Sequence, residues 1–548
     1  MEYWKRITPP LCYSGTPFGT TPMKTIRRIS QAIFLGLFLY LISITAYPLR
    51  PGVPVDLFVR LDPLVAGASM LAAGALIPAM ALALIVVGIT VLLGRVFCGW
   101  VCPLGTTLDA SDKVFFRKKD RRDAVRLHSL KYYILIGLFV SALFTMQAVY
   151  LLDPLSLLTR TIVIVFVAPI QTVFRWLAEV FYGWSSSGFG PLAATGMWLS
   201  DRMGGWQLIA GPQLYFRQAF LVLAIFVAIV GLNSLSRRFW CRSLCPLGAL
   251  LGLLSHVPIL KRAVSNQCND CAKCIADCKA GAIHENPRLT RTTECVECFN
   301  CVGRSREDGC PTGAISFRFR PKPEFPKETR LNLPRRRVLQ GAGVGLAFAA
   351  MATIDPGRKH AAGATSPIKL SSQELIRPPG SVRECQFVAR CARCGICMKV
   401  CPTNGLQPAL HEAGIEGFWT PVLVPRIGCC TEHCNACGEA CPTDAIMPFE
   451  IEEKKHVFIG AGVIDRSRCI AWNSDRTCLV CDEYCSYKAI EWKTADGVKR
   501  PFVNERKCVG CGICESACPI QPVAAIRVYS FGDKRHMTRE EQKEWAEA

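Results

Sequence analysis

The chain has 548 residues, of which 50% are hydrophobic and 20% are charged. This composition is too apolar for an ordinary soluble enzyme and too polar for a chain that lies wholly in a bilayer, so we expect a membrane part and a soluble part. The net charge of +21 is compatible with nucleic-acid binding, but the basic residues flank apolar runs, where they usually set membrane orientation. We therefore expect a membrane protein with no nucleic-acid partner.

Four apolar runs approach the roughly 20 residues that a helix needs to cross a hydrocarbon core about 30 Å thick. The loop at 95–131 carries nine basic residues, whereas the loop at 48–74 carries two. The positive-inside rule therefore places the loop at 95–131 and the N-terminus in the cytoplasm. We predict membrane helices at 30–47, 75–94, 132–150 and 219–235.

Another apolar run, at 161–180, contains Pro169, Arg175 and Glu179. If this run crossed the membrane, the basic cluster that follows residue 235 would lie outside. We therefore predict that it forms an interfacial helix.

The membrane part contains an internal repeat. The sequence LDPL occurs at 61–64 and at 152–155, each time on the outer side before an inward span, and CxxxCPLG follows each of these spans. A parallel duplication would bring four thiols together at the inner membrane edge, and four thiolates are enough for one iron-sulfur cluster. The alternative is that they are small buried residues or a thiol pair without metal. These residues are Cys98, Cys102, Cys241 and Cys245.

Eight of the 31 cysteines form two groups at 268–310. Their spacing is typical of a two-cluster ferredoxin, in which three close thiolates bind one 4Fe-4S cluster and the fourth cysteine of each group reaches across to the other cluster. Zinc, the alternative, favours two CxxC pairs separated by a longer segment. The spacing predicts one ligand set of Cys268, Cys271, Cys274 and Cys310, and a second of Cys295, Cys298, Cys301 and Cys278.

Four further groups of four cysteines follow residue 380, which predicts four more clusters and about six in all. The first and last groups have the bacterial ferredoxin spacing, whereas the middle two are looser at the first interval. Cys429 is an alternative ligand to Cys430, which we favour, and Cys12 and Cys385 belong to no group. The groups are Cys391, Cys394, Cys397 and Cys401; Cys430, Cys434, Cys437 and Cys441; Cys469, Cys478, Cys481 and Cys485; and Cys508, Cys511, Cys514 and Cys518.

Other cofactors are not indicated by the sequence. There is no CxxCH motif for covalent haem, and none of the eight histidines lies in the four predicted spans. There is no P-loop, and Gly341, Gly343 and Gly345 lack the strand-turn-helix context of a dinucleotide site.

The stretch RRRVLQGAGVGLAFAA at 335–350 has the form of an export signal, although it lies in the middle of the chain. As a helix, the apolar residues 339–354 would extend about 24 Å, which is short for a span. Eight basic residues at 318–337 against four at 358–377 favour an inside-to-outside direction. We predict a fifth span that is retained in the protein.

These motifs resemble two known families. The first part of the chain, with CGWVCPLG, CRSLCPLG and a two-cluster ferredoxin pattern, resembles the NapH-type membrane ferredoxins. The part that begins with the export signal and continues with four cysteine groups resembles the NapG-type twin-arginine-exported ferredoxins, which hold four 4Fe-4S clusters. The resemblance covers nearly the whole chain and implies a fusion of the two, which pass electrons from membrane quinol to a periplasmic reductase.

The resemblance also carries expectations for the cluster ligands and the partner. By analogy with four-cluster subunits of this type, we expect nested pairing, with the two middle groups also exchanging their fourth cysteines. The middle groups differ from the NapG pattern in spacing, and one chain does not identify the acceptor, so the terminal partner remains open. In the outer groups this pairing joins Cys518 to Cys391, Cys394 and Cys397, and Cys401 to Cys508, Cys511 and Cys514.

We predict an α-helical membrane domain with four spans and a fifth, and two α+β ferredoxin-like iron-sulfur modules. The expected boundaries are 1–260 for the membrane domain, 261–320 for the cytoplasmic two-cluster ferredoxin, 321–380 for the linker with the fifth span, 381–535 for the periplasmic four-cluster ferredoxin and 536–548 for a polar tail. The protein would lie in the inner membrane with several spans.

The predicted function is electron transfer between the quinone pool and a periplasmic or membrane redox subunit, such as a cytochrome or reductase, in either direction. This is the role of a quinol dehydrogenase-type component of a respiratory complex. The alternative is a redox sensor or a factor that helps to assemble a respiratory enzyme. Quinol oxidation releases protons, so the repeated Asp62 and Asp153 are candidates for the quinone site, although the favoured explanation for both is a helix cap before a proline.

Overall fold

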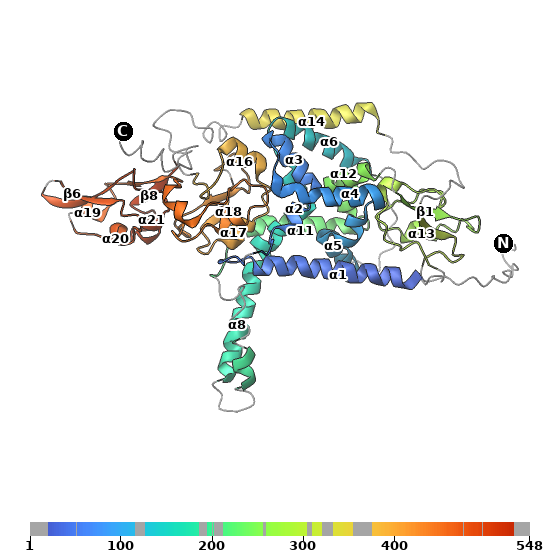
Figure 1. The fold of residues 1–548 in the computed structure, drawn as a ribbon, viewed down its shortest axis with the longest axis horizontal. Helices are drawn as coiled ribbons and strands as arrows, with labels where there is room; N and C mark the ends of the chain where they lie inside the picture. Colours follow the sequence, from blue (N-terminus) through green and yellow to red (C-terminus); the bar gives the residue numbers. More distant parts are fainter. Residues whose placement is uncertain are drawn as a thin grey trace.

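The computed structural model describes residues 20–50, 52–115, 127–185, 194–199, 201, 212–255, 259–303, 309–319, 333–354, 375–410, 412–474, 476–495 and 497–530. Two cysteine-rich modules lie at opposite ends of a central helical domain (Figure 1). We call them the N-module, at 259–319, and the C-module, at 375–530. Helix α14 (Arg335–Ile354) runs along the helical domain from the N-module side to the C-module side.

The helical domain contains long helices that run between the two modules and shorter ones that cover their ends (Figure 1). Its elements are α1 (Thr20–Ile44), α2 (Leu57–Arg60), α3 (Pro63–Ala73), η1 (Pro78–Leu82), α4 (Ala83–Leu93), η2 (Phe97–Val101), α5 (Pro103–Phe115), α6 (Leu130–Leu143), η3 (Val149–Leu151), α7 (Pro154–Thr161), η4 (Ile162–Phe166), α8 (Val167–Ser185), α11 (Ala219–Gly231), η5 (Leu232–Ser234), η6 (Trp240–Leu244) and α12 (Pro246–Leu254).

Both repeated motifs begin helices. Asp62 and Asp153 are the N-cap residues of α3 and α7, and proline occupies the first turn of each helix, where its missing N–H has no cost. The CxxxC segments form matching π-helical turns, η2 and η6, in which Cys102 N–H donates to Phe97 O and Cys245 N–H donates to Trp240 O, each at 2.9 Å. Since π-turns are rare and occur mostly at functional sites, the shared conformation marks both copies.

Helix lengths differ from those expected from hydropathy. By length and composition, two helices among the described residues are long and apolar enough to cross a membrane, Met23–Ile44 and Pro154–Gly183. The predicted span at 132–150 is wrong in length, because α6 ends at Leu143 and is followed by a turn and by η3. The span expected at 75–94 begins only at Pro78, with a 3-10 turn, and the one expected at 219–235 is helical from Ala219 to Ser234.

The helix that contains the run at 161–180 is part of a longer continuous segment, α7–η4–α8. Its distal half, α8, projects away from the bundle, across the direction of α1 and α14 (Figure 1). Length and composition alone make this segment a candidate span, whereas its orientation relative to α1 and α14 fits the interfacial position that we predict.

Helix α14 packs against α6 through glycines. A Cβ atom on Gly345 would lie 2.2 Å from Gly137 O, and one on Gly341 would lie 2.9 Å from Tyr133 O. Gly341 and Gly345 form a GxxxG pattern, which allows two helix backbones to approach closely in a membrane. Gly341 and Gly345 therefore serve helix packing, whereas a Cβ atom on Gly343 would meet nothing within 4 Å. The 20 residues of α14 extend about 30 Å, further than its apolar run alone.

The two modules are built from short helices and two-stranded antiparallel sheets. In the N-module, β1 (Leu260–Val264) pairs with β2 (Ile315–Phe319), and between them lie α13 (Lys273–Asp277) and η7 (Thr292–Glu294). In the C-module β3 pairs with β4, β5 with β8 and β6 with β7. Its elements are α16 (Glu384–Arg390), α17 (Ile396–Val400), β3 (Leu406–Pro408), β4 (Pro421–Leu423), α18 (Ala436–Glu439), η8 (Ile451–His456), β5 (Ala461–Ile464), α19 (Ile470–Asn473), α20 (Val480–Glu483), β6 (Ile490–Ala495), β7 (Val498–Val503), α21 (Ile513–Ala517) and β8 (Ile526–Tyr529).

Candidate metal centres

The N-module brings its eight thiols together in two sets, with the grouping that the spacing predicts. The first, N-set 1, forms around Cys274, whose thiol lies within electrostatic range of the other three members. The second, N-set 2, forms around Cys298, which interacts with Cys278, Cys295 and Cys301. N-set 1 is Cys268, Cys271, Cys274 and Cys310, and N-set 2 is Cys278, Cys295, Cys298 and Cys301.

Four CxxCxxC loops share an unusual backbone conformation around the middle cysteine. The residues immediately before and after the middle cysteine have positive φ in each loop. Residues in this region cost roughly 1–3 kcal/mol where they are not glycine, and they persist mainly at ligand and active sites. The four pairs are Asp270 and Ala272, Glu297 and Phe299, Arg393 and Gly395, and Gly510 and Gly512, with φ between 50° and 83°.

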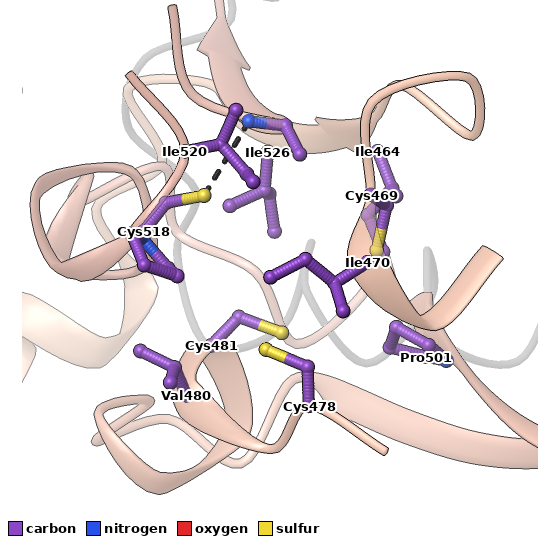
Figure 2. Close-up of a pocket in the computed structure, with 12 residues that line it drawn as sticks. Ile464, Cys469, Ile470, Cys478, Val480, Cys481, Pro501, Cys518, Ile520 and Ile526 are labelled. Atoms are coloured by element: carbon purple, nitrogen blue, oxygen red, sulfur yellow. Dashed lines mark hydrogen bonds between the residues drawn. The ribbon is translucent and has the colours of Figure 1, made fainter. Parts of the chain in front are cut away.

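The C-module contains four sets of thiols, three of which line enclosed spaces. C-set 1 is Cys391, Cys394, Cys397 and Cys441, around an empty volume of about 370 Å³. C-set 3 is Cys485, Cys508, Cys511 and Cys514, around about 370 Å³. C-set 4 is Cys469, Cys478, Cys481 and Cys518, around about 390 Å³, and their sulfur atoms point into one space (Figure 2). C-set 2 is Cys401, Cys430, Cys434 and Cys437, whose thiols interact with one another.

The nested pairing that we expected from the resemblance is wrong. Cys441, not Cys518, completes the set of Cys391, and Cys485, not Cys401, completes the set of Cys508. Thus the first cysteine group exchanges its fourth thiol with the second group, and the third exchanges with the fourth. The C-module is therefore two consecutive two-cluster units, each built like the N-module.

The two alternatives for the ligand near residue 430 are now distinguished. Cys430 interacts with Cys401, Cys434 and Cys437. Cys429 interacts with Cys401 and Cys430 but is not among the partners of Cys434 or Cys437. The carbonyl of Cys429 accepts a hydrogen bond from Thr403 Oγ1 at 2.6 Å. Cys385 is exposed and apart from the sets, and Cys12 lies outside the described residues.

Four cysteine sulfur atoms in the modules accept hydrogen bonds from backbone N–H groups that lie four to seven residues later in the chain. Figure 2 includes one of them, from Ala525 N–H to Cys518 Sγ at 3.4 Å. Hydrogen bonds to ligand sulfurs are one of the means by which a protein sets the potential of an iron-sulfur cluster. The acceptors are Cys278, Cys441, Cys485 and Cys518, each the last cysteine of its group.

The four cysteines of the CxxxC turns also meet. The thiol of Cys102 interacts with Cys98 and Cys241, and Cys245 interacts with all three others. We call Cys98, Cys102, Cys241 and Cys245 the helix set. Its thiols lie at the end of the helical domain that contacts the N-module. At this contact a Cβ atom on Gly99, next to Cys98, would lie 2.2 Å from Val296 O, in the loop of N-set 2.

Two buried arginines flank the helix set. Arg95 lies within electrostatic range of Cys98 and Cys245, and Arg238 lies within electrostatic range of Cys241 and Cys298. Arg238 is held by Asp109, whose carboxylate accepts from Nε and Nη2 at 2.9 Å each. Burial alone would raise the pKa of Asp109, but Arg238, Lys279 and Arg27 outweigh it and hold that pKa below its usual range. Fixed positive charge beside four thiols fits an anionic iron-sulfur cluster.

The donor sets fit 4Fe-4S clusters better than zinc. Among the residues that the structure describes, no three His, Cys, Asp or Glu side chains converge closely enough to hold a single metal ion. A zinc site needs such convergence, with Zn–S distances of about 2.3 Å. The four thiols of each of these sets instead line a common pocket, in which a cubane of four irons and four sulfides could be bound by one thiol at each iron.

The sets follow one another through the molecule. Cys274 of N-set 1 and Cys301 of N-set 2 lie within electrostatic range of each other. Arg238 lies within range of Cys298 of N-set 2 and of Cys241 of the helix set. On the other side of the helical domain, C-set 1 meets C-set 2 through Cys397 and Cys437. C-set 2 meets C-set 3, where Cys430 N–H donates to Cys511 O at 2.9 Å, and C-set 3 meets C-set 4 through Cys514 and Cys481.

C-set 1 faces the helical domain. The guanidinium of Arg393 stacks 3.2 Å above the ring of Tyr150 and donates to Gln147 O at 2.7 Å. A second buried arginine, Arg160, stacks 3.9 Å from the ring of Trp419. These arginines carry no signal in the sequence, because nothing in the local pattern distinguishes an arginine buried between domains from an exposed one.

Asp62 and Asp153 are fully buried and face each other closely enough to interact. Asp62 accepts from Leu64 N–H at 2.8 Å, and Asp153 accepts from Ser156 N–H at 2.7 Å. Burial and the neighbouring Asp153 raise the pKa of Asp62. The helix-cap interpretation therefore accounts for both residues, and neither lines the enclosed spaces of the C-module sets.

Family comparisons match several of these segments. A family described as a 4Fe-4S binding domain matches residues 75–122 and 218–266, which contain the two halves of the helix set. A family described as a 4Fe-4S dicluster domain matches residues 476–521, which contain most of the ligands of C-sets 3 and 4. The second match agrees with the pairing of the third and fourth cysteine groups in one unit.

Several curated proteins resemble the chain. It is 34% identical over 164 residues to the methylamine utilization ferredoxin-type protein MauM of Methylorubrum extorquens, covering 28% of this chain and 72% of MauM. It is 31% identical over 161 residues to the ferredoxin-type protein NapG of Escherichia coli, covering 27% of this chain and 68% of NapG. It is 27% identical over 246 residues to YccM of Escherichia coli, covering 43% and 54%. No solved structure matches the chain.

Proposed function

Because the chain belongs to the family of 4Fe-4S ferredoxin-type proteins that includes MauM and NapG, we propose that it is a membrane electron-transfer subunit. In this proposal it passes electrons between the quinone pool and a redox partner on the outer side of the membrane. A bound 4Fe-4S cluster supplies one-electron storage and transfer. The observation that carries the proposal is the succession of thiol sets from the N-module, past the helix set, to the far end of the C-module.

The helix set is proposed to bind a seventh cluster, in addition to the six in the modules. Its four thiols come together from two distant segments, two buried arginines lie beside them, and the matching family is described as a 4Fe-4S binding domain. A cluster at this place would shorten the gap between N-set 2 and the C-module, which is otherwise the width of the helical domain.

We further propose that the protein is a fusion of NapH-type and NapG-type parts, with the N-module in the cytoplasm and the C-module outside. The modules lie at opposite ends of the helical domain, and α14 connects those ends (Figure 1). The close packing of α14 on α6 supports retention of this helix as a fifth span. The outer partner would dock near C-set 4, which is the set furthest along the series from the helical domain.

The proposal can be tested with purified protein in lipid nanodiscs. Adding a reduced quinone should reduce the clusters of the C-module as well as those of the N-module, as followed by electron paramagnetic resonance. If the C-module clusters stay oxidised whatever the redox state of the partner, the electron-transfer proposal fails. That result would favour the alternative of a sensor or assembly factor, which needs no continuous path.

A further inference from the structure

A large groove lies between α6 and α14 on the side of α6 that faces away from the helix set. It has an empty volume of about 1420 Å³, and its walls are mainly apolar, with Ile134, Leu138, Val344 and Phe348 among them. The glycine contact between the helices forms its floor, because Gly137, Gly341 and Gly345 all line it. This volume includes solvent space, because the groove is open along one side.

Polar groups gather at one end of this groove. Ser129, Tyr133, Arg337 and Gln340 line it there, at the beginnings of α6 and α14, where both helices start from the N-module side. The hydroxyl of Tyr133 is buried and has no hydrogen-bond partner within the described part of the chain. Because this hydroxyl has almost no accessible surface, a ligand oxygen reaches it only after the Tyr133 side chain turns into the groove, and the new hydrogen bond would then relieve a cost of about 1–3 kcal/mol.

We propose that this groove is the quinone-binding site, with the ring at the polar end and the isoprenoid tail along the apolar walls. The choice of quinone as the ligand rests on the proposed function, and what the structure adds is the place where the quinone binds. A quinone carries two ring oxygens that accept hydrogen bonds and a long apolar tail, which match the polar end and the apolar length of the groove. A phospholipid would also fill the apolar walls and could bring ester or phosphate oxygens to the polar end, so the test below distinguishes a lipid from a quinone.

The groove is separated from the thiols of the helix set by a single helix, α6. On its other side α6 packs against η6 and α12, which carry Cys241 and begin directly after Cys245. The ring would therefore be separated from the helix set by the width of one helix, about 10 Å. Asp62 and Asp153, the candidates from the sequence, cap helices elsewhere and do not line the groove.

Quinol oxidation in the groove gives one quinone, two electrons and two protons for each quinol. Iron-sulfur clusters bound at the thiol sets would accept these electrons one at a time. The protons leave to water at the polar end, where Arg337 and Leu127 are exposed.

The test compares two substitutions of similar size on α14. Val344→Trp fills the groove, whereas Leu346→Trp places the same ring on an exposed position of the same helix outside it. Equilibrium binding of decylubiquinone to the oxidised protein in nanodiscs should weaken at least about tenfold in Val344→Trp, a loss of about 1.4 kcal/mol, and should not change in Leu346→Trp. Tyr133→Phe should weaken binding roughly fivefold, because one hydrogen bond of about 1 kcal/mol is lost.

Binding is measured without electron transfer, so the site and the proposed function can fail separately. Equal decylubiquinone binding by all variants would overturn the groove as the quinone site. The groove would also be excluded if native mass spectrometry finds a phospholipid that Val344→Trp expels while quinone binding persists. If the wild type binds decylubiquinone in the groove but reduced decylubiquinol reduces none of its clusters, the site stands and the electron-transfer proposal fails.

Discussion

Glu294→Gln should loosen the junction between the N-module and the helical domain. Glu294 lies at the end of η7, is only 3% exposed and accepts hydrogen bonds from three groups of the helical domain. Arg95 Nη1 lies 3.3 Å from Glu294 Oε2, and Tyr132 Oη donates to Glu294 Oε1 at 2.9 Å. Lys131 Nζ also contacts Glu294 Oε2. Arg95 and Lys131 are almost completely buried, so the substitution would leave two cations without their carboxylate.

The expected loss is large but has an upper limit. Removing one partner of a buried ion pair typically costs about 3–5 kcal/mol. Burial lowers the pKa of Lys131, so in the variant this group can fold as the neutral amine. Releasing a proton from a lysine of ordinary pKa, about 10.4, costs about 4.6 kcal/mol near pH 7, which limits the penalty from Lys131.

The same limit predicts a pH dependence. The folded variant would bind fewer protons than its unfolded chain, because the pKa of Lys131 is lower in the folded state. Stability of the variant relative to wild type should therefore rise with pH up to the unfolded pKa. Near pH 9.5 the proton release costs only about 1.2 kcal/mol, so most of the deficit from Lys131 should disappear.

Equilibrium unfolding in mild detergent measures this effect. Glu285→Gln, an exposed carboxylate in the same module, is the control and should change stability by less than about 0.5 kcal/mol. Iron content should be measured for both variants, because Glu294 precedes the ligand Cys295. A deficit below about 1 kcal/mol near neutral pH, or one that does not shrink as the pH rises, would refute the reasoning.

Four further predictions follow from the sites. Cys98→Ser should lower the iron content by about four atoms from about 28 per chain, whereas a constant value near 24 would exclude a cluster at the helix set. Cys441→Ser should leave C-sets 2 to 4 oxidised after quinol addition, because C-set 1 precedes them, and their normal reduction would contradict that order. Gly345→Leu should speed amide hydrogen exchange in α6 and α14, because its Cβ would lie 2.2 Å from Gly137 O, and unchanged exchange would contradict the close contact. Asp62→Asn should retain stability and quinol reduction, because asparagine caps helices as well as aspartate, and a selective loss of quinol reduction would restore the proton-transfer role.

Local spacing predicted those features that depend on a few neighbouring residues. The N-module sets could be assigned because one compact loop and one returning cysteine complete each set. The pairing in the C-module could not be assigned in this way, since the choice between Cys441 and Cys518 depends on which groups fold against each other. Hydropathy located the apolar helices but not their ends, because turns such as the one after Leu143 interrupt an apolar run without changing its composition.

The internal repeat explains why the helical domain forms one unit. Each CxxxC turn supplies two thiols, so neither copy can bind a 4Fe-4S cluster by itself, and the four thiols meet only when η2 and η6 lie side by side. The LDPL copies meet as well, through Asp62 and Asp153. Two carboxyl groups buried together do not ionise together, so Asp62 keeps its proton and can donate a hydrogen bond to Asp153. The duplication therefore explains the aspartates, because each copy begins a helix with an aspartate cap. The four thiols form a set that a single copy cannot provide.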